Sequence, residues 1–373
     1  MITVLYLETG SGYGGSAQSL AGLLSAIDRS RIRPIVVAYE EGSGIAKIRA
    51  LGVPVTVVGP GAARTRGYAA LLWAWLTREW PRAWALERLI RAEGVDLVHL
   101  NTDIYSTVAG LWAARWTRRP VACHIRLTRP LTRLERWLGR WANAIIVPTE
   151  EAKAFYRRWW PAQRLERIWN AVEIPSQRVR PDNGRAAQGG PRVGLVARCV
   201  RGKGYEEFLR AAALVRQQWP TAQFSVIGNG PGGDAVYERR MRHLADVLLL
   251  NGALTWEGWK NNMPEMYDHL DIVAQVSTTF PEGFGRVAIE AMAMGKPVVV
   301  TALPVYQEVV GDAAVVVSVG DAQALADAIL GLLRDPSRSQ ALVQQGQRRV
   351  LERFSLPAQA QRIMALYDEV CRP

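Results

Sequence analysis

Along the chain, short runs of hydrophobic residues alternate with longer stretches in which hydrophobic and polar positions are mixed. In the first half, six runs rich in β-branched residues predict strands, and the stretches between them have the apolar spacing of helices. These runs are ITVLYL (2–7), IRPIVVAY (32–39), VPVTVV (53–58), VDLVHL (95–100), PVACHI (120–125) and AIIVPT (144–149). Regular alternation of strands and helices predicts a parallel sheet covered by helices on both faces.

The alternation stops once and then starts again. Residues 176–191, SQRVRPDNGRAAQGGP, are rich in Gly, Pro and polar side chains and lack apolar periodicity, which is typical of a linker. The strand candidates beyond it are PRVGLVA, FSVIG, ALTWEG, DIVAQVS, KPVVVT and AAVVVSV. We therefore predict two doubly wound α/β domains, 1–175 and 192–354, joined by the linker and followed by a final helix in 355–373. Ligands of such sheets bind at the carboxyl ends of the strands, so a cleft between the domains is the expected site.

Composition agrees with a two-domain globular protein. Of the 373 residues, 49% are hydrophobic and 21% are charged, which is enough apolar material for two cores. Cys123, Cys199 and Cys371 form neither a disulfide framework nor a closely spaced metal pair, so a reducing compartment is expected. The chain shows no signal-peptide pattern, and the apolar run AALLWAWL (69–76) is shorter than the roughly 18–20 residues that span a bilayer. We expect a cytoplasmic protein without a transmembrane helix.

Positive charge is concentrated in the first half. Residues 1–175 carry 24 Lys and Arg against 14 Asp and Glu, out of a net charge of +12 for the chain, and hold 11 of the 14 tryptophans. Segments 64–91 and 126–144 place Trp and Arg at helical spacing, which suits an interface with anionic lipid headgroups.

The alternative for these segments is a solvated basic face over core tryptophans, and the general preference for Arg, 41 of 46 basic residues, favours it. No nucleic-acid-binding pattern occurs, so nucleic acid is not an expected partner. The hypothesis is a peripheral protein that docks on the inner leaflet and takes a lipid-linked or otherwise membrane-borne acceptor.

The sharpest local motif is PEGFGRVAIEAMAMGKPVVVT (281–301). Glu282 lies in a strand-to-helix turn before Gly283 and Gly285, and Glu290 follows on the second turn of the helix. The glycines let backbone amides and the positive end of the helix face an anion, while the carboxylates can accept hydrogen bonds from sugar hydroxyls. A helix-capping acid and a surface glutamate are the ordinary alternative.

A second constellation, VGLVARCVRGKGYEEFL (193–209), places two cations near a helix start. Arg198 ends a strand and Lys203 follows between two glycines. Two cations beside a helix N-terminus suit a departing diphosphate, although a solvated glycine-rich turn explains the same residues. In FSVIGNGPGG, Gly228 and Gly230 follow a strand and allow close approach of a nucleotide, but the spacing does not support a nicotinamide site.

The first strand and helix are joined by ETGSGYGGSAQSL (8–20). Gly14 and Gly15 lead into that helix, where phosphate or sugar oxygens can meet its amides, unless the loop only turns the chain. His124 ends the strand PVACHI on the expected cleft side, although a lone histidine is more often structural. No DxD at a strand end, HExxH or Cys/His cluster occurs, nor a GxSxG or GxxxxGK[ST] motif, so neither metal nor cofactor is expected.

Together these segments resemble the retaining glycosyltransferases of the GT-B fold, specifically family 4 (glycosyl transferases group 1), which uses nucleotide-sugar donors. EGFGRVAIEAMAMGKPVV looks like that family's E-x7-E signature, and ARCVRGKG, VIGNGPGG, YGGSAQSL, WNAVEIP and the closing RFS…Y helix are also similar. The resemblance covers nearly the whole chain and is strongest in 190–373. It implies two Rossmann-like domains facing across a cleft, with the C-terminal helix crossing back to the N-terminal domain.

The resemblance also implies roles for individual residues. Arg198 and Lys203 bind the donor diphosphate, Glu282 contacts the transferred sugar, Glu290 binds the ribose hydroxyls, and His124 faces the donor sugar. The residues expected to act in catalysis are thus His124, Glu282, Arg198 and Lys203. Those expected to bind the donor are Gly14, Gly15, Arg198, Lys203, Gly228, Gly230, Glu282, Gly283, Phe284, Gly285 and Glu290, the Phe284 and Gly285 contacts being made by backbone.

The implied reaction moves a sugar from a UDP- or GDP-sugar to a glycan or lipid-linked acceptor of the kind used in cell-envelope polysaccharides. The family implies a hexosyltransferase of class EC 2.4 that needs no metal and retains the anomeric configuration. Two alternatives stay open: a nucleotide-sugar epimerase or phosphorylase on the same fold, and a non-catalytic nucleotide-sugar-binding subunit.

Overall fold

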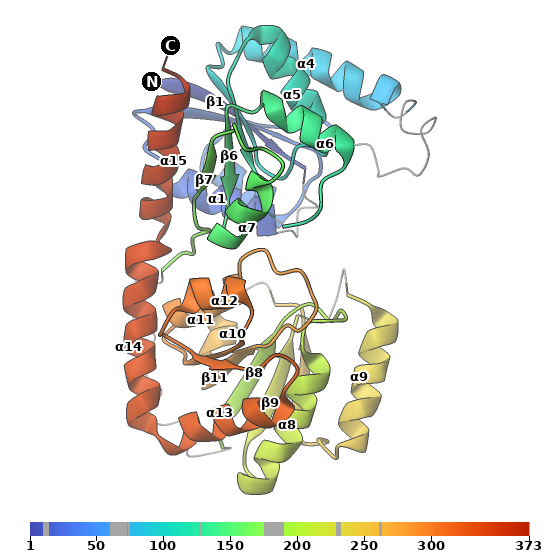
Figure 1. Cartoon of the computed structure of the whole chain (residues 1–373), viewed down its shortest axis with the longest axis vertical. Coiled ribbons are helices and arrows are strands. Elements are labelled where there is room, and N and C mark those ends of the chain that lie inside the picture. The colour runs from blue at the N-terminus through green and yellow to red at the C-terminus, as the bar shows by residue number, and fades with distance from the viewer. Residues whose placement is uncertain are drawn as a thin grey trace. The chain divides into compact units, whose positions relative to one another are not determined.

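The chain forms two compact units, each built on one parallel sheet (Figure 1). The computed structural model describes residues 1–9, 15–59, 73, 75–126, 128–174, 190–228, 233–260 and 263–372. The first unit comprises Met1–Ala171 with Leu356–Pro373, and the second comprises Val172–Ser355. The prediction of two Rossmann-like α/β domains is confirmed, whereas all of the expected linker before residue 190 lies outside the described residues.

The first unit has a seven-stranded parallel sheet with strand order β3-β2-β1-β4-β5-β6-β7. Its strands are β1 (Ile2–Glu8), β2 (Ile32–Ala38), β3 (Val55–Val57), β4 (Leu97–Leu100), β5 (Val121–His124), β6 (Ala144–Val147) and β7 (Leu165–Arg167). Its helices are α1 (Gly15–Ala26), α2 (Ser43–Ala50), the π-helical η1 (Trp75–Glu79), α4 (Trp80–Ala92), α5 (Val108–Thr117), α6 (Arg133–Leu138), the 3₁₀ turn η2 (Gly139–Trp141), α7 (Glu150–Arg157) and α15 (Leu356–Val370). The sequence pattern missed β7, because its three residues, LER, contain only one apolar side chain.

Alternation along the central strand β1 divides the core of this unit into two layers. Leu5 and Leu7 lie in one hydrophobic cluster with residues of α4 and α5, while Val4 and Tyr6 lie in the other with residues of α1, α2 and α15. Successive strand side chains point to opposite faces, so one strand supplies both layers.

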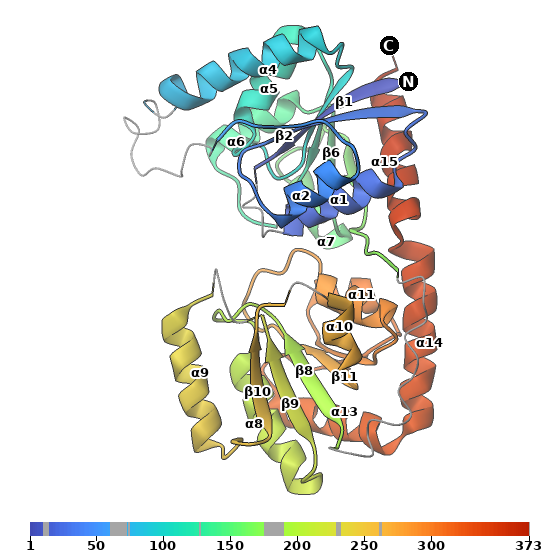
Figure 2. The same cartoon turned by 180° about the vertical axis from the view of Figure 1, so that it is seen from behind.

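The C-terminal helix α15 belongs to the first unit. It packs on α1, and the buried hydroxyl of Tyr367 lies 2.7 Å from Nδ1 of His99. Nε2 of Gln359 donates to the backbone oxygen of Trp169 at 2.7 Å. The predicted return of this helix to the N-terminal domain is therefore confirmed (Figures 1 and 2).

The second unit has a six-stranded parallel sheet with strand order β10-β9-β8-β11-β12-β13 (Figure 2). Its strands are β8 (Arg192–Val196), β9 (Gln223–Ile227), β10 (Leu254–Gly258), β11 (Ile272–Gln275), β12 (Val298–Thr301) and β13 (Val315–Val317). Its helices are α8 (Tyr205–Gln218), α9 (Ala235–Val247), α10 (Met263–Asp268), α11 (Arg286–Ala293), α12 (Pro304–Val310), α13 (Ala322–Arg334) and α14 (Pro336–Arg353). The order of strands reverses between β8 and β11, and ligands of doubly wound sheets bind outside such a switch point.

Candidate functional site

Two loops at the switch point of the second unit carry half of the predicted site residues. The loop after β8 holds Arg198 and Lys203, and the loop after β11 holds Glu282. Because β8 and β11 are neighbours in a parallel sheet, their carboxyl ends lie at the same edge. The structure brings these three residues together from segments some 80 positions apart, as the sequence predicts.

Lys203 and Glu282 form a largely buried ion pair. Nζ of Lys203 donates to Oε1 of Glu282 at 2.5 Å, and the two side chains are 14% and 9% exposed. The hydroxyl of Ser277 donates to the same carboxylate oxygen at 2.5 Å and in turn accepts from the hydroxyl of Tyr306 at 3.0 Å. Burial lowers the pKa of Lys203 although Glu282 opposes this change, and the positive charge of Arg198 lowers that pKa further.

Phe280 connects the two cations. Nζ of Lys203 lies 3.9 Å from the centre of its ring, and the guanidinium carbon of Arg198 lies 6.0 Å from the same centre. Arg198 is exposed and has no carboxylate partner among the described residues, whereas Lys203 is already paired. The pair of loops therefore presents an excess of positive charge beside an aromatic face, an arrangement suited to a diphosphate.

The turn between Glu282 and α11 is largely buried, because Phe284 and Gly285 are both buried residues. Phe284 is 3% exposed and its ring packs edge-on against Phe354 with centroids 5.8 Å apart, so the predicted contact of its backbone with a ligand needs a local rearrangement and stays a prediction. Gly285 caps α11 with φ of +90°, and a Cβ there would lie 2.9 Å from the Tyr306 ring. Gly283 lies between Glu282 and Phe284 in the same turn.

Glu290 lies on the second turn of α11, as predicted, and both of its oxygens are held. Nη2 of Arg286 donates to Oε1 at 3.1 Å, and the hydroxyl of Tyr267 donates to Oε2 at 3.1 Å. Burial, together with the charge of Glu290, raises the pKa of Tyr267 well above its usual value. The carboxylate is thus fixed in one orientation on the helix surface, 18% exposed.

The predicted glycines lie at strand and helix ends. Gly228 follows β9 with φ of +104°, and a Cβ there would lie 2.6 Å from the Ala197 carbonyl oxygen, so only glycine allows this approach to the loop that carries Arg198. Gly15 is the first residue of α1, and open space surrounds the position of its absent Cβ. Gly14 and Gly230 lie outside the described residues.

His124 lies at the carboxyl end of β5 in the first unit, as predicted, but its ring is fully buried. Neither ring nitrogen has a hydrogen-bond partner among the described residues. Burial is the main cause that lowers its pKa well below the usual value, and the positive charge of Arg126 and the neighbouring His99 add to it, so the imidazole is neutral. With no exposed surface, this ring needs a local rearrangement before it can face a sugar, and that role stays a prediction.

A polar network that the sequence pattern did not predict lies at the same edge of the first sheet as His124. Buried Glu8 accepts from Oγ of Ser16 at 2.8 Å and from the side-chain amide of Asn101. Arg126 donates to Oδ1 of Asn101 at 2.5 Å and to Oδ1 of Asn170 at 2.8 Å. Glu8 ends β1 and Asn101 follows β4, the strands between which the order reverses, and polar residues directly after these strands were the available signal.

Several tryptophans of the first unit form one packed cluster, and some of its members are also partly exposed. This cluster, with neighbouring ring centroids 4.5–6.1 Å apart, contains Trp75, Trp80, Trp112, Trp116, Trp137 and Trp141. Trp84 is 53% exposed, and Trp137 and Trp80 are 46% and 41% exposed. Pro81 lies in the first turn of α4, a position where the missing N–H of proline is tolerated.

The described residues contain no helix long and apolar enough to cross a bilayer. The same part of the chain holds no group of three or more His, Cys, Asp or Glu side chains that could bind a metal ion.

Two Rossmann-like units with charged loops at the carboxyl ends of their strands are typical of GT-B glycosyltransferases, and comparison with known proteins agrees. Residues 178–349 match the family model described as glycosyl transferases group 1, and residues 13–174 match glycosyltransferase family 4. The D-inositol 3-phosphate glycosyltransferase of Corynebacterium urealyticum is 32% identical over 305 residues, which are 73% of this chain and 71% of that protein. The chain belongs to glycosyltransferase family 4.

Two further similarities cover much of the chain. The phosphatidyl-myo-inositol mannosyltransferase of Mycobacterium leprae is 28% identical over 290 residues, which are 74% of each chain. The crystal structure of Anabaena Alr3699/HepE in complex with UDP and glucose superposes with a TM-score of 0.80 at 23% identity, covering 99% of this chain and 100% of that one. This last similarity establishes the GT-B fold.

Proposed function

We propose that this glycosyltransferase moves a sugar from a nucleotide diphosphate sugar to a hydroxyl group of a glycan or lipid-linked acceptor, with retention and without a metal ion. The observation that carries the proposal is the Lys203–Glu282 ion pair with Arg198 at the same aromatic ring. UDP is present in the Anabaena complex, the mycobacterial relative is a mannosyltransferase, and a retaining mechanism is typical of the family.

Leaving-group stabilisation is the largest contribution in this proposal. Breaking the bond between the anomeric carbon and the diphosphate leaves negative charge on the phosphate oxygens. In this proposal the Arg198 guanidinium binds the phosphate oxygens directly. Lys203 leaves the Glu282 carboxylate and donates to a phosphate oxygen instead. Each preorganised group of this kind lowers the activation free energy by about 2.7–4 kcal/mol.

The remaining residues orient the donor. Once Lys203 turns to the diphosphate, the Glu282 carboxylate is free to accept hydrogen bonds from the transferred sugar. The turn at the start of α11, where Phe284 and Gly285 are buried, opens in this proposal so that their backbone holds sugar and phosphate oxygens near the positive end of the helix. Glu290, fixed by Arg286 and Tyr267, accepts from the ribose hydroxyls.

Retention follows from attack on the face that the diphosphate leaves. The acceptor hydroxyl oxygen bonds to the anomeric carbon as the carbon–oxygen bond to phosphate breaks. The hydroxyl proton passes to the departing phosphate oxygen, so no separate protein base is required. The products are the glycosylated acceptor and a free nucleoside diphosphate.

A thermal-shift panel of UDP-, GDP- and ADP-sugars tests donor binding first. A ligand at 100 times its Kd adds about 2.7 kcal/mol to the free energy of unfolding, so the correct base gives a clear rise in Tm. Release of nucleoside diphosphate only in the presence of acceptor distinguishes transfer from an epimerase or a phosphorylase. An inverted product, an absolute need for Mg²⁺, or no response to any nucleotide sugar contradicts the proposal.

A membrane-borne acceptor is the second part of the proposal. Trp80 and Trp84 on α4 are half exposed, and tryptophan favours the interfacial region of a bilayer. The mycobacterial relative is named for a lipid acceptor. Flotation with vesicles, comparing the protein with its Trp80→Ser/Trp84→Ser variant, tests this surface: equal recovery with the vesicles rules it out.

A further inference from the structure

The first unit has a large cavity at the edge of the sheet opposite its strand carboxyl ends. The cavity has a volume of about 820 Å³, and Ile2, Asp96, Val121 and Asn143 line it. These residues stand at or directly before the starts of β1, β4, β5 and β6. Glu8, Asn101 and His124 stand at the other ends of the same strands. With about 3.3 Å per residue, four-residue strands separate the two edges by roughly 13 Å, so the cavity lies outside the candidate catalytic edge.

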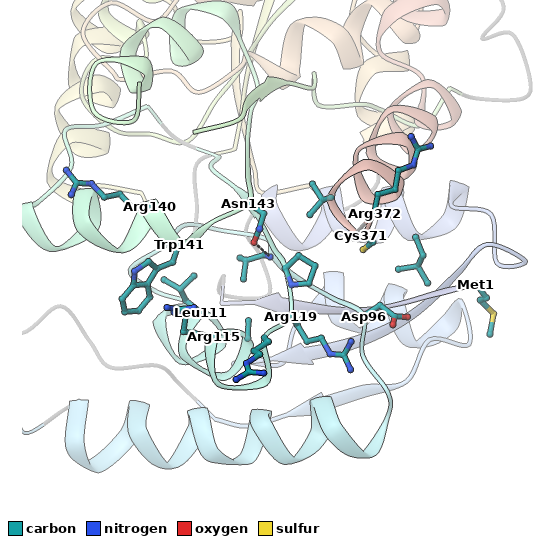
Figure 3. A pocket seen from close by; sticks show the side chains of 16 residues that line it. Met1, Asp96, Leu111, Arg115, Arg119, Arg140, Trp141, Asn143, Cys371 and Arg372 are labelled. Carbon is teal, nitrogen blue, oxygen red and sulfur yellow. Dashed lines mark hydrogen bonds between the residues drawn. The ribbon is translucent and has the colours of Figure 1, made fainter. Parts of the chain in front are cut away.

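Five arginines line the cavity, and they come from three separate segments. Arg115, Arg118 and Arg119 lie at the end of α5, Arg140 lies in η2, and Arg372 follows α15. Figure 3 shows Arg140 and Arg372 at opposite ends of the cavity, with Arg115 and Arg119 between them. The wall is therefore basic along its whole length.

The positive charge of this wall is not neutralised within the described chain. None of the five guanidinium groups forms an ion pair there. The single acidic residue of the lining is Asp96, and its Oδ2 already accepts from the backbone amide of Thr3 at 2.8 Å. Five arginines that face one carboxylate repel one another, and a bound polyanion removes that repulsion.

Arg118 stands in a conformation that a side chain disfavours. It caps α5 in the left-handed region, with φ of 56° and ψ of 35°, and the next amide, that of Arg119, donates to the Ala114 carbonyl at 2.8 Å. Glycine usually occupies this position. Basic residues at a helix C-terminus are ordinarily explained by their favourable interaction with the helix dipole. The dipole accounts neither for the strained backbone conformation of Arg118 nor for Arg140, which lies on another element.

An apolar wall accompanies the charge. Leu111 and Trp141 line the same cavity, and the Arg115 guanidinium carbon lies 6.0 Å from the centre of the Trp141 ring. Trp141 also joins the tryptophan cluster through Trp137 and Trp112. A ligand of this cavity thus meets cations at one part of its surface and an indole at another.

We propose that this cavity binds a phosphate ester, with its phosphate oxygens on Arg115, Arg118 and Arg119 and its organic part against Leu111 and Trp141. Planar guanidinium groups match phosphate oxygens in paired hydrogen bonds. The volume is within the range of ligand pockets and far exceeds one phosphate group. A lipid headgroup and a soluble phosphate ester share this chemistry, and two experiments separate them.

The test variant is Arg115→Gln/Arg118→Gly/Arg119→Gln. It removes three like charges and places glycine where the backbone favours it, so its Tm should equal or exceed that of the parent. The matched control, Arg210→Gln/Arg239→Gln/Arg348→Gln, removes three exposed arginines from the second unit, which likewise form no ion pair within the described residues. Leu249→Gly, at the other described non-glycine residue with positive φ, controls for the glycine substitution.

The first experiment tests for a soluble phosphate ester: the protein is titrated with inorganic pyrophosphate at low salt, and binding is measured by calorimetry. An Arg198→Gln/Lys203→Ala background removes the donor-site cations, so failure of the proposed donor site does not affect the result. In that background we expect binding that the cavity variant weakens at least about tenfold and that the control retains. The vesicle arm is flotation with phosphatidylcholine alone or with added phosphatidic acid, where losing three arginines should weaken partition on the order of 100-fold.

Each outcome decides the proposal. Loss of pyrophosphate binding in the cavity variant assigns a soluble phosphate ester, and loss of vesicle binding alone assigns a lipid headgroup. If the cavity variant behaves like the control in both arms, or the parent binds neither probe, the cavity is not a phosphate site.

Discussion

The ammonium group of Lys203 lies 3.9 Å from the centre of the Phe280 ring, although the same nitrogen is already bonded to the Glu282 carboxylate. The ring carries no charge that could compete with a diphosphate, yet its face attracts a cation. It therefore keeps Lys203 beside Arg198 when the carboxylate is exchanged for a phosphate oxygen. This contact makes Phe280 a positioning residue for the proposed donor site.

Phe280→Leu should weaken donor binding while preserving the fold. Leucine keeps much of the apolar volume but lacks the aromatic face, and a cation–π contact at a partly exposed site contributes about 0.5–1 kcal/mol. The Kd of the best nucleotide sugar, measured by calorimetry, should rise about two- to fivefold. Phe155→Leu, which removes a similar contact with Arg158 in the first unit, is the control. Equal affinities in the two variants would show that the ring has no role.

Lys203→Ala should lower kcat by about 10²–10³-fold, because it removes one of the two cations to which the proposed mechanism assigns stabilisation of the leaving diphosphate. It also leaves the Glu282 carboxylate, 9% exposed, without its cation, so Tm is measured alongside turnover. Lys153→Ala on α7 is the matched control. Near-normal turnover in a folded Lys203→Ala protein contradicts the assignment.

Gly285→Ala should damage both stability and donor binding. At φ of +90° alanine is strained, and its Cβ would lie 2.9 Å from the Tyr306 ring, whose hydroxyl supports Ser277 and thereby Glu282. We expect a loss of about 1–3 kcal/mol in the free energy of unfolding, measured by urea denaturation, and a rise in donor Kd. Gly252→Ala also has positive φ but meets open space. It should cost less and leave donor binding unchanged; a matching change in Kd would argue against the Tyr306 contact.

Much of the fold was predictable because parallel sheets have a simple sequence pattern. Strands such as β1, β8 and β12 consist mainly of apolar residues, and they are found close to where they were expected. β7 was not, because pairing with β6 rather than its own composition makes Leu165–Arg167 a strand.

The candidate site was predictable to the extent that its residues lie in glycine-rich turns. Arg198, Lys203 and Glu282 follow that rule, and the structure places them together. Phe280 and Tyr306 could not be predicted in this way, because their contacts with Lys203 and Ser277 depend on which loops become neighbours across the sheet. Four of the five cavity arginines lie in the basic half of the sequence and Arg372 lies outside it, and the convergence of all five from α5, η2 and the end of α15 is a property of the fold.

The buried imidazoles of His99 and His124 predict loss of stability in acid. Burial is the first cause in both: it lowers the pKa of His99 to about 3 and that of His124 well below the usual 6.5. In the unfolded chain both rings bind protons below about pH 6.5, whereas in the native protein they do not. The unfolded state therefore binds more protons, and stability falls as the pH drops below 6.5 and continues to fall toward pH 3.

Each histidine should cost about 2 kcal/mol between pH 7.5 and pH 5, or about 4 kcal/mol together. Urea denaturation at the two pH values measures this difference. His124→Leu removes one of the two groups, so the difference should shrink by about half, while His99 keeps its bond to Tyr367. An unchanged pH dependence in this variant would mean that His124 is not held neutral in the native protein. That outcome would also favour a ring open to solvent at the carboxyl end of β5, where its predicted contact with the donor sugar requires it.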